Sequence, residues 1–155
     1  MDSEFMQEAI RLAVENVRSG RGGPFAAIVV KDGRVVATGA NSVTSTNDPT
    51  AHAEVTAIRE ACRILNTFQL DGCEIYTSCE PCPMCLGAIY WARPDRVYFA
   101  ATAADAAGAG FDDSYIYDEL ARKHSERRIP FEPCMSEAGM EPFRAWKEKD
   151  DRIRY

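Results

Sequence analysis

The strongest constraint on this chain comes from two short segments that stand about thirty positions apart. The later one, residues 78–85, reads Ser-Cys-Glu-Pro-Cys-Pro-Met-Cys and supplies Cys82 and Cys85. The earlier one reads His52-Ala53-Glu54. Imidazole nitrogen and thiolate sulfur are donors that zinc takes readily in proteins. A fold that used these donors together would have to bring the two segments side by side.

The spacing of the donors suits two helix starts. Cys82 and Cys85 are three positions apart, which on a helix places both thiols on one face. A helix N-terminus also favours the thiolate form of cysteine. A second helix is predicted from about Ala51 to Leu65 with Thr50 as its N-cap, which puts His52 in its first turn. Two such helix starts, facing each other at strand ends, would gather one nitrogen and two sulfur donors.

Three protein ligands leave the fourth position of a zinc ion for water, which is typical of a catalytic site. Bound zinc can bring the pKa of that water down to about 7, so that it becomes a nucleophile at neutral pH. Hydrolysis then needs a proton carrier that is near the metal but not bound to it. Glu54, two residues from His52 at the same helix end, is the predicted carrier.

Two other interpretations of the cysteines stay open at this point. Cys79 could act as a fourth ligand and close the site into a structural one, although it precedes Pro81 and is expected to lie off the helix face. Cys82 and Cys85 could instead form a redox pair at a helix start, as in thioredoxin-like proteins. The redox interpretation leaves the His-x-Glu segment without a role.

The composition bounds the remaining possibilities. The chain has 155 residues, enough for one domain, and 46% apolar residues, which is typical of a folded globule. Its net charge of −6 is unfavourable for a nucleic-acid binder, which gains affinity from cationic contacts to phosphate. Neither a secretory leader nor a run of about 18 apolar residues is found, so we expect a cytoplasmic protein that does not enter the membrane.

The middle of the chain alternates strands with helices, which predicts an α/β fold with a largely parallel sheet. An amphipathic helix over residues 3–19, with Ser3 as its N-cap, comes first and is expected to serve packing alone. Asp32-Gly33 is a strong signal for a hairpin turn, and Pro81 suits the first turn of the helix that carries Cys85. The predicted strands are Phe25–Val30, Arg34–Thr38, Glu74–Thr77 and Arg96–Ala101.

The pattern weakens after Ala101. Residues 103–110 are small and flexible in composition, and helices are predicted over residues 114–123 and 141–149. The segment 129–134 is extended, but its two prolines argue against a central strand. No internal repeat or linker is evident, so residues 1–155 are predicted to form a single domain.

The two metal segments resemble the signature of the zinc-dependent cytidine deaminase superfamily, which joins a His-x-Glu to a Pro-Cys-x-x-Cys. Residues 47–58 and 76–93 look like its bacterial branch, which contains guanine deaminases and tRNA adenosine deaminases. Residues 110–114 and the tail ending in Tyr155 are similar to the guanine deaminases in particular. The resemblance implies a three-layer α/β/α fold with a five-stranded mixed sheet, and one Zn²⁺ per subunit held by His52, Cys82 and Cys85.

The resemblance also implies the hydrolysis of guanine to xanthine and ammonia, with Glu54 as the proton shuttle. Asp113 is a candidate both for guanine selectivity and for relaying a proton to the leaving amine. The other substrate-binding residues that it implies are Phe25, Asn41, Ala53, Trp91 and Tyr155. Asn41 carries both a donor and an acceptor, as a purine edge requires. Phe25 and Trp91 would be walls of the pocket.

The expected partners are a purine base and a second copy of the chain. The likeness implies a homodimer whose C-terminal segment is exchanged between subunits, with residues 106–110 as the hinge. No nucleic-acid partner is expected, since the basic residues near 122–128 and 147–154 are interleaved with acidic ones, as on a solvated helix face. Guanosine deamination, tRNA adenosine deamination and a non-enzymatic zinc module remain the alternatives.

Overall fold

The computed structural model describes residues 2–155, which divide into two compact units, residues 2–113 and 114–155. The first unit contains the whole sheet and both metal segments. The prediction of one domain over residues 1–155 stays a prediction. No helix in the described part of the chain is long and apolar enough to cross a membrane.

The first unit is built on a four-stranded mixed sheet with the order β2-β1-β3-β4. β1 is antiparallel to both of its neighbours, and β3 and β4 form the parallel pair. The mixed sheet confirms one expectation, whereas a largely parallel sheet was wrong, because β1 enters through a hairpin and reverses against β2 and β3. The strands are β1 (Ala26–Lys31), β2 (Arg34–Ala40), β3 (Cys73–Cys79) and β4 (Arg96–Ala101).

The expected fifth strand is not found among the described residues, and β4 stands at the edge of the sheet. The chain after β4 turns directly into a short helix, α5 (Ala103–Gly108). Thr102 and Asp105 form a capping box there, each side chain accepting a backbone N–H of the other. The extended segment 129–134 forms no strand, and its two prolines lack the N–H groups that a ladder needs.

The predicted hairpin is confirmed. Asp32 and Gly33 both have positive φ, at 49° and 70°. This is the conformation that a two-residue hairpin turn with the right twist requires. It joins β1 to β2 at the end of the sheet farthest from the metal segments.

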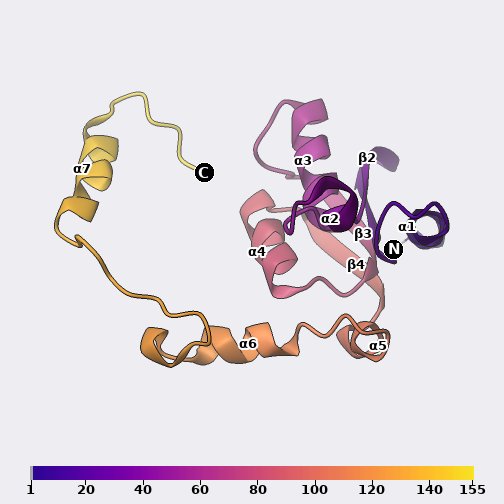
Figure 1. The fold of residues 1–155 in the computed structure, drawn as a ribbon. Coiled ribbons are helices and arrows are strands. Elements are labelled where there is room, and N and C mark those ends of the chain that lie inside the picture. Colours follow the sequence, from indigo (N-terminus) through magenta and orange to yellow (C-terminus); the bar gives the residue numbers. More distant parts are fainter. Residues whose placement is uncertain (1) are drawn as a thin grey trace. The chain divides into compact units, whose positions relative to one another are not determined.

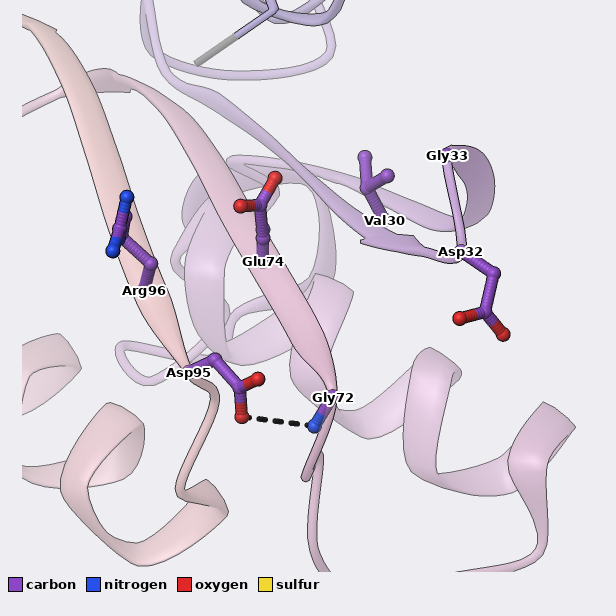
Figure 2. A pocket seen from close by; sticks show the side chains of 7 residues that line it. All are labelled: Val30, Asp32, Gly33, Gly72, Glu74, Asp95 and Arg96. Atoms are coloured by element: carbon purple, nitrogen blue, oxygen red, sulfur yellow. Dashed lines mark hydrogen bonds between the residues drawn. The ribbon is translucent and has the colours of Figure 1, made fainter.

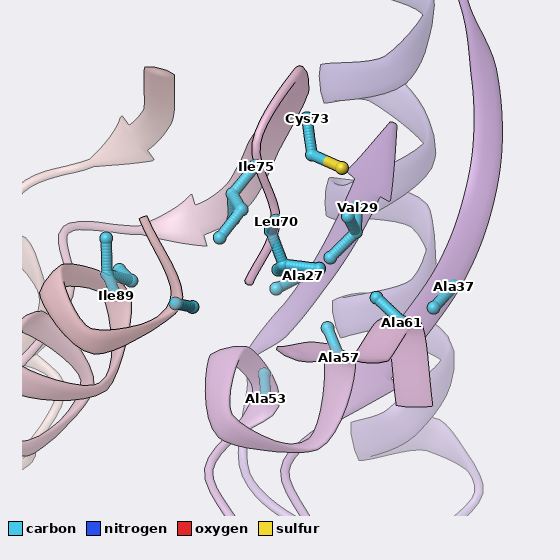
Figure 3. Close-up of a cluster of buried hydrophobic side chains, with 11 residues drawn as sticks. Ala27, Val29, Ala37, Ala53, Ala57, Ala61, Leu70, Cys73, Ile75 and Ile89 are labelled. Atoms are coloured by element: carbon cyan, nitrogen blue, oxygen red, sulfur yellow. The ribbon is translucent and has the colours of Figure 1, made fainter. Parts of the chain in front are cut away.

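Helices cover both faces of the sheet, which gives the predicted α/β/α layering (Figure 1). On one face, α1 (Ser3–Arg18) packs Phe5, Met6 and Leu12 against Ile28, Val30 and Tyr76. The other face is covered by α3 (Ala53–Leu65) and α4 (Pro83–Ala92), whose alanines and Ile89 meet Val29, Leu70 and Ile75 (Figure 3). N-capping of α1 falls to Asp2, whose side chain accepts from Glu4 N–H, and not to Ser3.

A glycine sets the distance between α3 and the sheet. A Cβ atom on Gly39 would stand 2.2 Å from the Ala53 carbonyl oxygen and 2.5 Å from the Ala57 nitrogen. Such a contact is sterically forbidden, so only glycine lets the first turn of α3 lie this close to β2. Gly39 thereby fixes the position of the helix start that carries His52 and Glu54. The polar loop between β2 and His52 contains one short helix, α2 (Val43–Thr46).

The second unit contains two α-helices, α6 (Ser114–Ala121) and α7 (Glu141–Glu148), close to the predicted ranges. Two 3₁₀ turns, η1 (His124–Glu126) and η2 (Ala138–Met140), lie between them. No residue of this described unit is buried, and Phe131, Phe143 and Trp146 are all exposed. Residues 114–155 therefore form no hydrophobic core of their own.

Candidate metal centre

Each of the two metal segments contains the N-cap residue of a helix. His52 is the N-cap of α3 and Cys82 is the N-cap of α4, with Pro83 at the first helical position. Both caps have extended backbones, and neither side chain is used to cap its helix. The helix starts predicted at Thr50 and Pro81 were therefore each about two residues early. The consequence is that the imidazole and the thiol stand at the tips of their helices, available to a ligand.

The structure brings His52, Cys82 and Cys85 together as the one cluster of possible metal donors found among the described residues. The Nδ1 atom of His52 lies 3.4 Å from the Cys82 sulfur and 3.5 Å from the Cys85 sulfur. All three donor atoms lie within 4.8 Å of one another. Cys85 is one turn into α4, so the two thiols share a helix face as predicted.

These separations fit a zinc ion. Tetrahedral zinc bonded to sulfur at about 2.3 Å and to nitrogen at about 2.05 Å holds those two donors about 3.6 Å apart. The observed values of 3.4 and 3.5 Å match this spacing. The donor set of one imidazole and two thiols also suits zinc and disfavours calcium or magnesium. With three protein donors, the fourth position stays open to water or substrate.

Cys79 does not join the cluster of metal donors. Its thiol donates to the Thr102 carbonyl at 3.6 Å, at the end of β4. Burial raises its pKa, which disfavours the thiolate form that a metal needs. The arrangement therefore favours the open three-ligand site over the closed four-ligand one.

The hydrogen bonds among the three donors shift their pKa values. Hydrogen bonds from Cys85 and His52 lower the pKa of the Cys82 thiol. The pKa of Cys85 is raised by its hydrogen bond to Cys82, and that of His52 is raised by its hydrogen bond to Cys82. Of the three donors, Cys82 therefore loses its proton most readily, whereas Cys85 and His52 hold theirs more firmly than usual. Metal binding would displace those protons, as zinc sites generally require.

Glu54 stands beside the donors but is not one of them. It is the second residue of α3, its side chain is only 6% exposed, and its Oε2 atom accepts from the Cys85 thiol at 3.4 Å. Burial raises the pKa of its carboxyl. A carboxyl that is buried beside the metal donors, and that holds its proton more firmly than usual, is suited to pick up and return protons.

The end of β2 and the start of β1 lie next to this cluster. Asn41 follows β2 and is nearly buried, and its backbone N–H donates to the Phe25 carbonyl at 3.0 Å. The next residue, Ser42, donates to the Ala51 carbonyl at 3.0 Å, which ties this loop to the segment preceding His52. The predicted base-binding residues Phe25 and Asn41 are therefore neighbours at the metal end of the sheet.

Two residues in this region escaped the sequence analysis. Phe111 stacks edge-on against Phe25, with ring centroids 5.0 Å apart, and so adds an aromatic wall. Asn16, on a helix expected to serve packing alone, is fully buried and hydrogen-bonds the Asn41 carbonyl at 2.8 Å. A signal for Asn16 existed, because it continues the apolar stripe of Ala9 and Ala13 at helical spacing with an amide instead of a hydrophobic side chain.

Asp113 is also brought near the metal donors. Its charge contributes to the raised pKa of His52, and the charge of the Cys82 thiolate contributes to the raised pKa of Asp113. Burial is the main cause that raises the pKa of Asp113 itself. Ala53 is fully buried as the first residue of α3.

Two further predicted residues are placed differently. Trp91 lies about 9 Å along the axis of α4 from Cys85 and is 65% exposed, so it stands apart from the buried donors. Tyr155 is 71% exposed and belongs to the second unit. The roles assigned to these two side chains stay predictions.

A hollow at the other end of the sheet offers no competing site. It is lined by residues at the end of β1, in the β1–β2 turn and at the starts of β3 and β4 (Figure 2). Two of its carboxylates already accept hydrogen bonds within the protein: Asp95 accepts from the Gly72 N–H at 2.9 Å, and Glu74 accepts from the Tyr76 hydroxyl at 2.9 Å. The chemistry of the chain is therefore concentrated at the zinc end.

An α/β/α layer with a zinc-type donor set at two helix starts and a buried glutamate defines the class of zinc-dependent hydrolytic deaminases. A family model described as the cytidine and deoxycytidylate deaminase zinc-binding region matches residues 1–101, and the chain belongs to this family. The match covers both metal segments and all four strands.

The similarity to individual relatives is high. The chain is 56% identical to guanine deaminase of Bacillus subtilis over 151 residues, which is 97% of each chain. A solved structure of guanine deaminase from Bacillus subtilis superposes with a TM-score of 0.97 at 55% identity, covering 100% of this chain and 99% of that one.

Other relatives match a smaller part of the chain. A tRNA-specific adenosine deaminase of Aquifex aeolicus is 46% identical over 97 residues, 63% of this chain and 64% of its own. A solved mutant protein in complex with 8-azaguanine matches at 35% identity with a TM-score of 0.68, over 70% of this chain and 63% of that one.

Proposed function

We propose that this protein is a zinc-dependent aminohydrolase that converts guanine and water into xanthine and ammonia, acting in the cytoplasm in the breakdown or salvage of purines. The observation that carries the proposal is the extent of the likeness. Identity to a guanine deaminase runs over 97% of the chain, whereas the match to the tRNA-specific deaminase covers 63%. The likeness to the guanine deaminase thus extends over the second unit, residues 114–155.

The base is bound by the residues that surround the open side of the metal cluster. Guanine presents N1–H and its 2-amino group as adjacent donors, and the carboxylate of Asp113 accepts from both. Asn41 supplies an amide to the purine edge, and Phe25 supplies an aromatic wall. The N–H of Ala53 is at the first position of α3, where a helix has no internal acceptor for it, so it can donate to the base.

His52, Cys82 and Cys85 hold the zinc ion, one per subunit. When bound, zinc supplies the nucleophile by lowering the pKa of a water molecule to about 7. Glu54 takes a proton from that water and delivers it to N3, the ring nitrogen beside the attacked C2 atom. Glu54 then takes the remaining proton from the new C2 hydroxyl group and, helped by Asp113, passes it to the 2-amino group, so that the C–N bond breaks, ammonia leaves, and the C2 oxygen becomes the second carbonyl of xanthine.

We infer that the working enzyme is a homodimer in which the C-terminal segment of each chain crosses to the other. The second unit has no buried residue, yet it exposes Phe143, Trp146 and Tyr155. Large apolar side chains in a unit without a core need a surface to cover them. In the proposed dimer, Tyr155 and Trp91 help to close a pocket around the base, and residues 106–110 act as the hinge.

The proposal is tested with purified, zinc-loaded protein. Ammonia release is measured with guanine, guanosine, adenine, cytosine and cytidine, and with a tRNA anticodon stem as the macromolecular substrate. We expect release from guanine and none from the tRNA stem. Absence of release from guanine would refute the function, and sedimentation of the protein as a monomer at micromolar concentration would refute the dimer alone.

A further inference from the structure

A buried amide on the opposite side of the sheet from α3 reaches the proposed base-binding loop. Asn16 lies in α1 and is 1% exposed. Its Nδ2 atom donates two hydrogen bonds, one to the Gly23 carbonyl at 2.9 Å and one to the Asn41 carbonyl at 2.8 Å. One side chain therefore ties together the turn before β1 and the residue that follows β2.

Two more contacts fix the position of Asn41. The Gly23 N–H donates to the side-chain Oδ1 of Asn41 at 3.3 Å, which fixes which way the Asn41 amide is turned. A Cβ atom on Gly22 would stand 2.0 Å from the Asn41 carbonyl oxygen, so this turn can approach Asn41 only as glycine. The backbone and the amide plane of Asn41 are thus held by a clamp consisting of Asn16, Gly22 and Gly23.

Burying the Asn16 amide costs free energy unless its polar atoms form hydrogen bonds. Asn16 brings a polar amide into a helix–sheet interface that is otherwise apolar, next to Ala9 and Ala13. Both of its N–H groups find carbonyl acceptors in residues at the metal end of the sheet, which offsets the loss of water. An alanine would fill the same helix position with better helix propensity. The presence of the amide is explained by the two carbonyl groups, of Gly23 and Asn41, that it holds together.

We propose that Asn16 is a positioning residue, which acts through Asn41 to present the Asn41 amide to the purine base. The inference rests on the proposed function, in which Asn41 binds guanine. Asn16 itself touches neither base nor metal. Its removal should weaken base recognition while leaving the zinc donors and Glu54 in place, because these belong to α3 and α4.

The first variant is Asn16→Ala, measured by steady-state ammonia release from guanine with zinc content determined in parallel. We expect kcat/KM to fall about tenfold or more, since misplacement by about 1 Å can cost this much. Zinc content should stay at one per subunit. A matched control is Tyr76→Phe, which removes the buried hydroxyl that accepts from Asp2 N–H at 3.1 Å on the same face of the sheet, without contact to the clamp.

A double-mutant cycle separates positioning from general destabilisation. In an Asn41→Ala background, Asn16 has nothing left to position, so Asn16→Ala should lower kcat/KM by less than about twofold more. A merely structural Asn16 would cost the same factor in both backgrounds.

A second variant keeps the test independent of how well Asn16→Ala folds. Gly22→Ala places a methyl group against the Asn41 carbonyl and should lower kcat/KM for guanine to a similar extent, again only when Asn41 is present. Gly87→Ala is its control, because a Cβ atom at Gly87 meets no heavy atom within 4 Å. If Asn16→Ala does not yield folded protein, the Gly22→Ala cycle decides the question.

Each outcome points to one conclusion. Wild-type protein that releases no ammonia from guanine overturns the proposed function, and with it this inference. Active wild type with additive losses, or with no loss in either clamp variant, overturns the inference alone. Non-additive losses at constant zinc content, with both controls unaffected, support it.

Discussion

Gly39→Ala tests how closely the zinc site depends on the spacing between α3 and the sheet. The added methyl would stand 2.2 Å from the Ala53 carbonyl oxygen and 2.5 Å from the Ala57 nitrogen. Both are backbone atoms, so neither can rotate away. An ordinary contact is restored only if α3 moves off β2 by about 1 Å, and overpacking of a core costs about 1–3 kcal/mol. We expect the upper end of that range.

The same movement would disturb the metal donors. His52 and Glu54 travel with α3, whereas Cys82 and Cys85 are on α4. A shift of about 1 Å would leave the nitrogen–sulfur separations of 3.4 and 3.5 Å unsuited to a common zinc ion. We therefore expect weaker zinc binding together with a kcat for guanine reduced about 10²-fold.

Stability is measured by thermal unfolding with and without added zinc, and metal content by elemental analysis. For a chain of this length, a loss of about 3 kcal/mol corresponds to a decrease in Tm of about 6–12 °C. Gly87→Ala is the matched control, because a methyl group there meets open space. A Gly39→Ala protein with the stability, zinc affinity and turnover of the wild type would refute this account of the α3–β2 contact.

Three further outcomes follow from the site. Glu54→Gln should retain zinc and lose about 10²–10⁴-fold in kcat, as loss of a proton carrier predicts; full activity would remove Glu54 from that role. Chelation should lower the Tm, and a chelator without effect would contradict zinc binding; at free zinc 1,000-fold above its Kd, the metal contributes about 4 kcal/mol. Asp113→Asn should weaken kcat/KM for guanine about 10–100-fold at unchanged zinc content, and equal turnover would contradict its contact with the base.

The sequence predicts those features that are determined by neighbouring residues. The Asp32-Gly33 turn and the shared face of Cys82 and Cys85 depend only on local geometry, and both are confirmed. The helix starts were predicted about two residues early, because His52 and Cys82 are extended N-caps whose side chains do not cap their helices, so the usual capping signal does not mark either boundary.

Features that depend on contacts between distant segments were harder to predict. The fifth strand was inferred from resemblance alone, and the described sheet has four because the chain enters a capped helix directly after β4. Asn16 was assigned to packing because its partners, Gly23 and Asn41, are 7 and 25 positions away in the sequence. Helical periodicity identifies the buried face of a helix, but it does not show which carbonyl groups that face meets.

The direction of the strands explains why the site could be located even though a largely parallel sheet was wrong. β1 is antiparallel to both β2 and β3, and β4 is parallel to β3, so β2, β3 and β4 all run the same way. Their carboxyl ends therefore share one edge of the sheet, where ligand sites of α/β proteins form. Asn41 follows the first of these ends, Cys82 the second, and the segment leading to Asp113 the third. A zinc site and a base-binding loop at that edge thus require only that these three strands agree in direction, and the reversed β1 between β2 and β3 leaves that agreement intact.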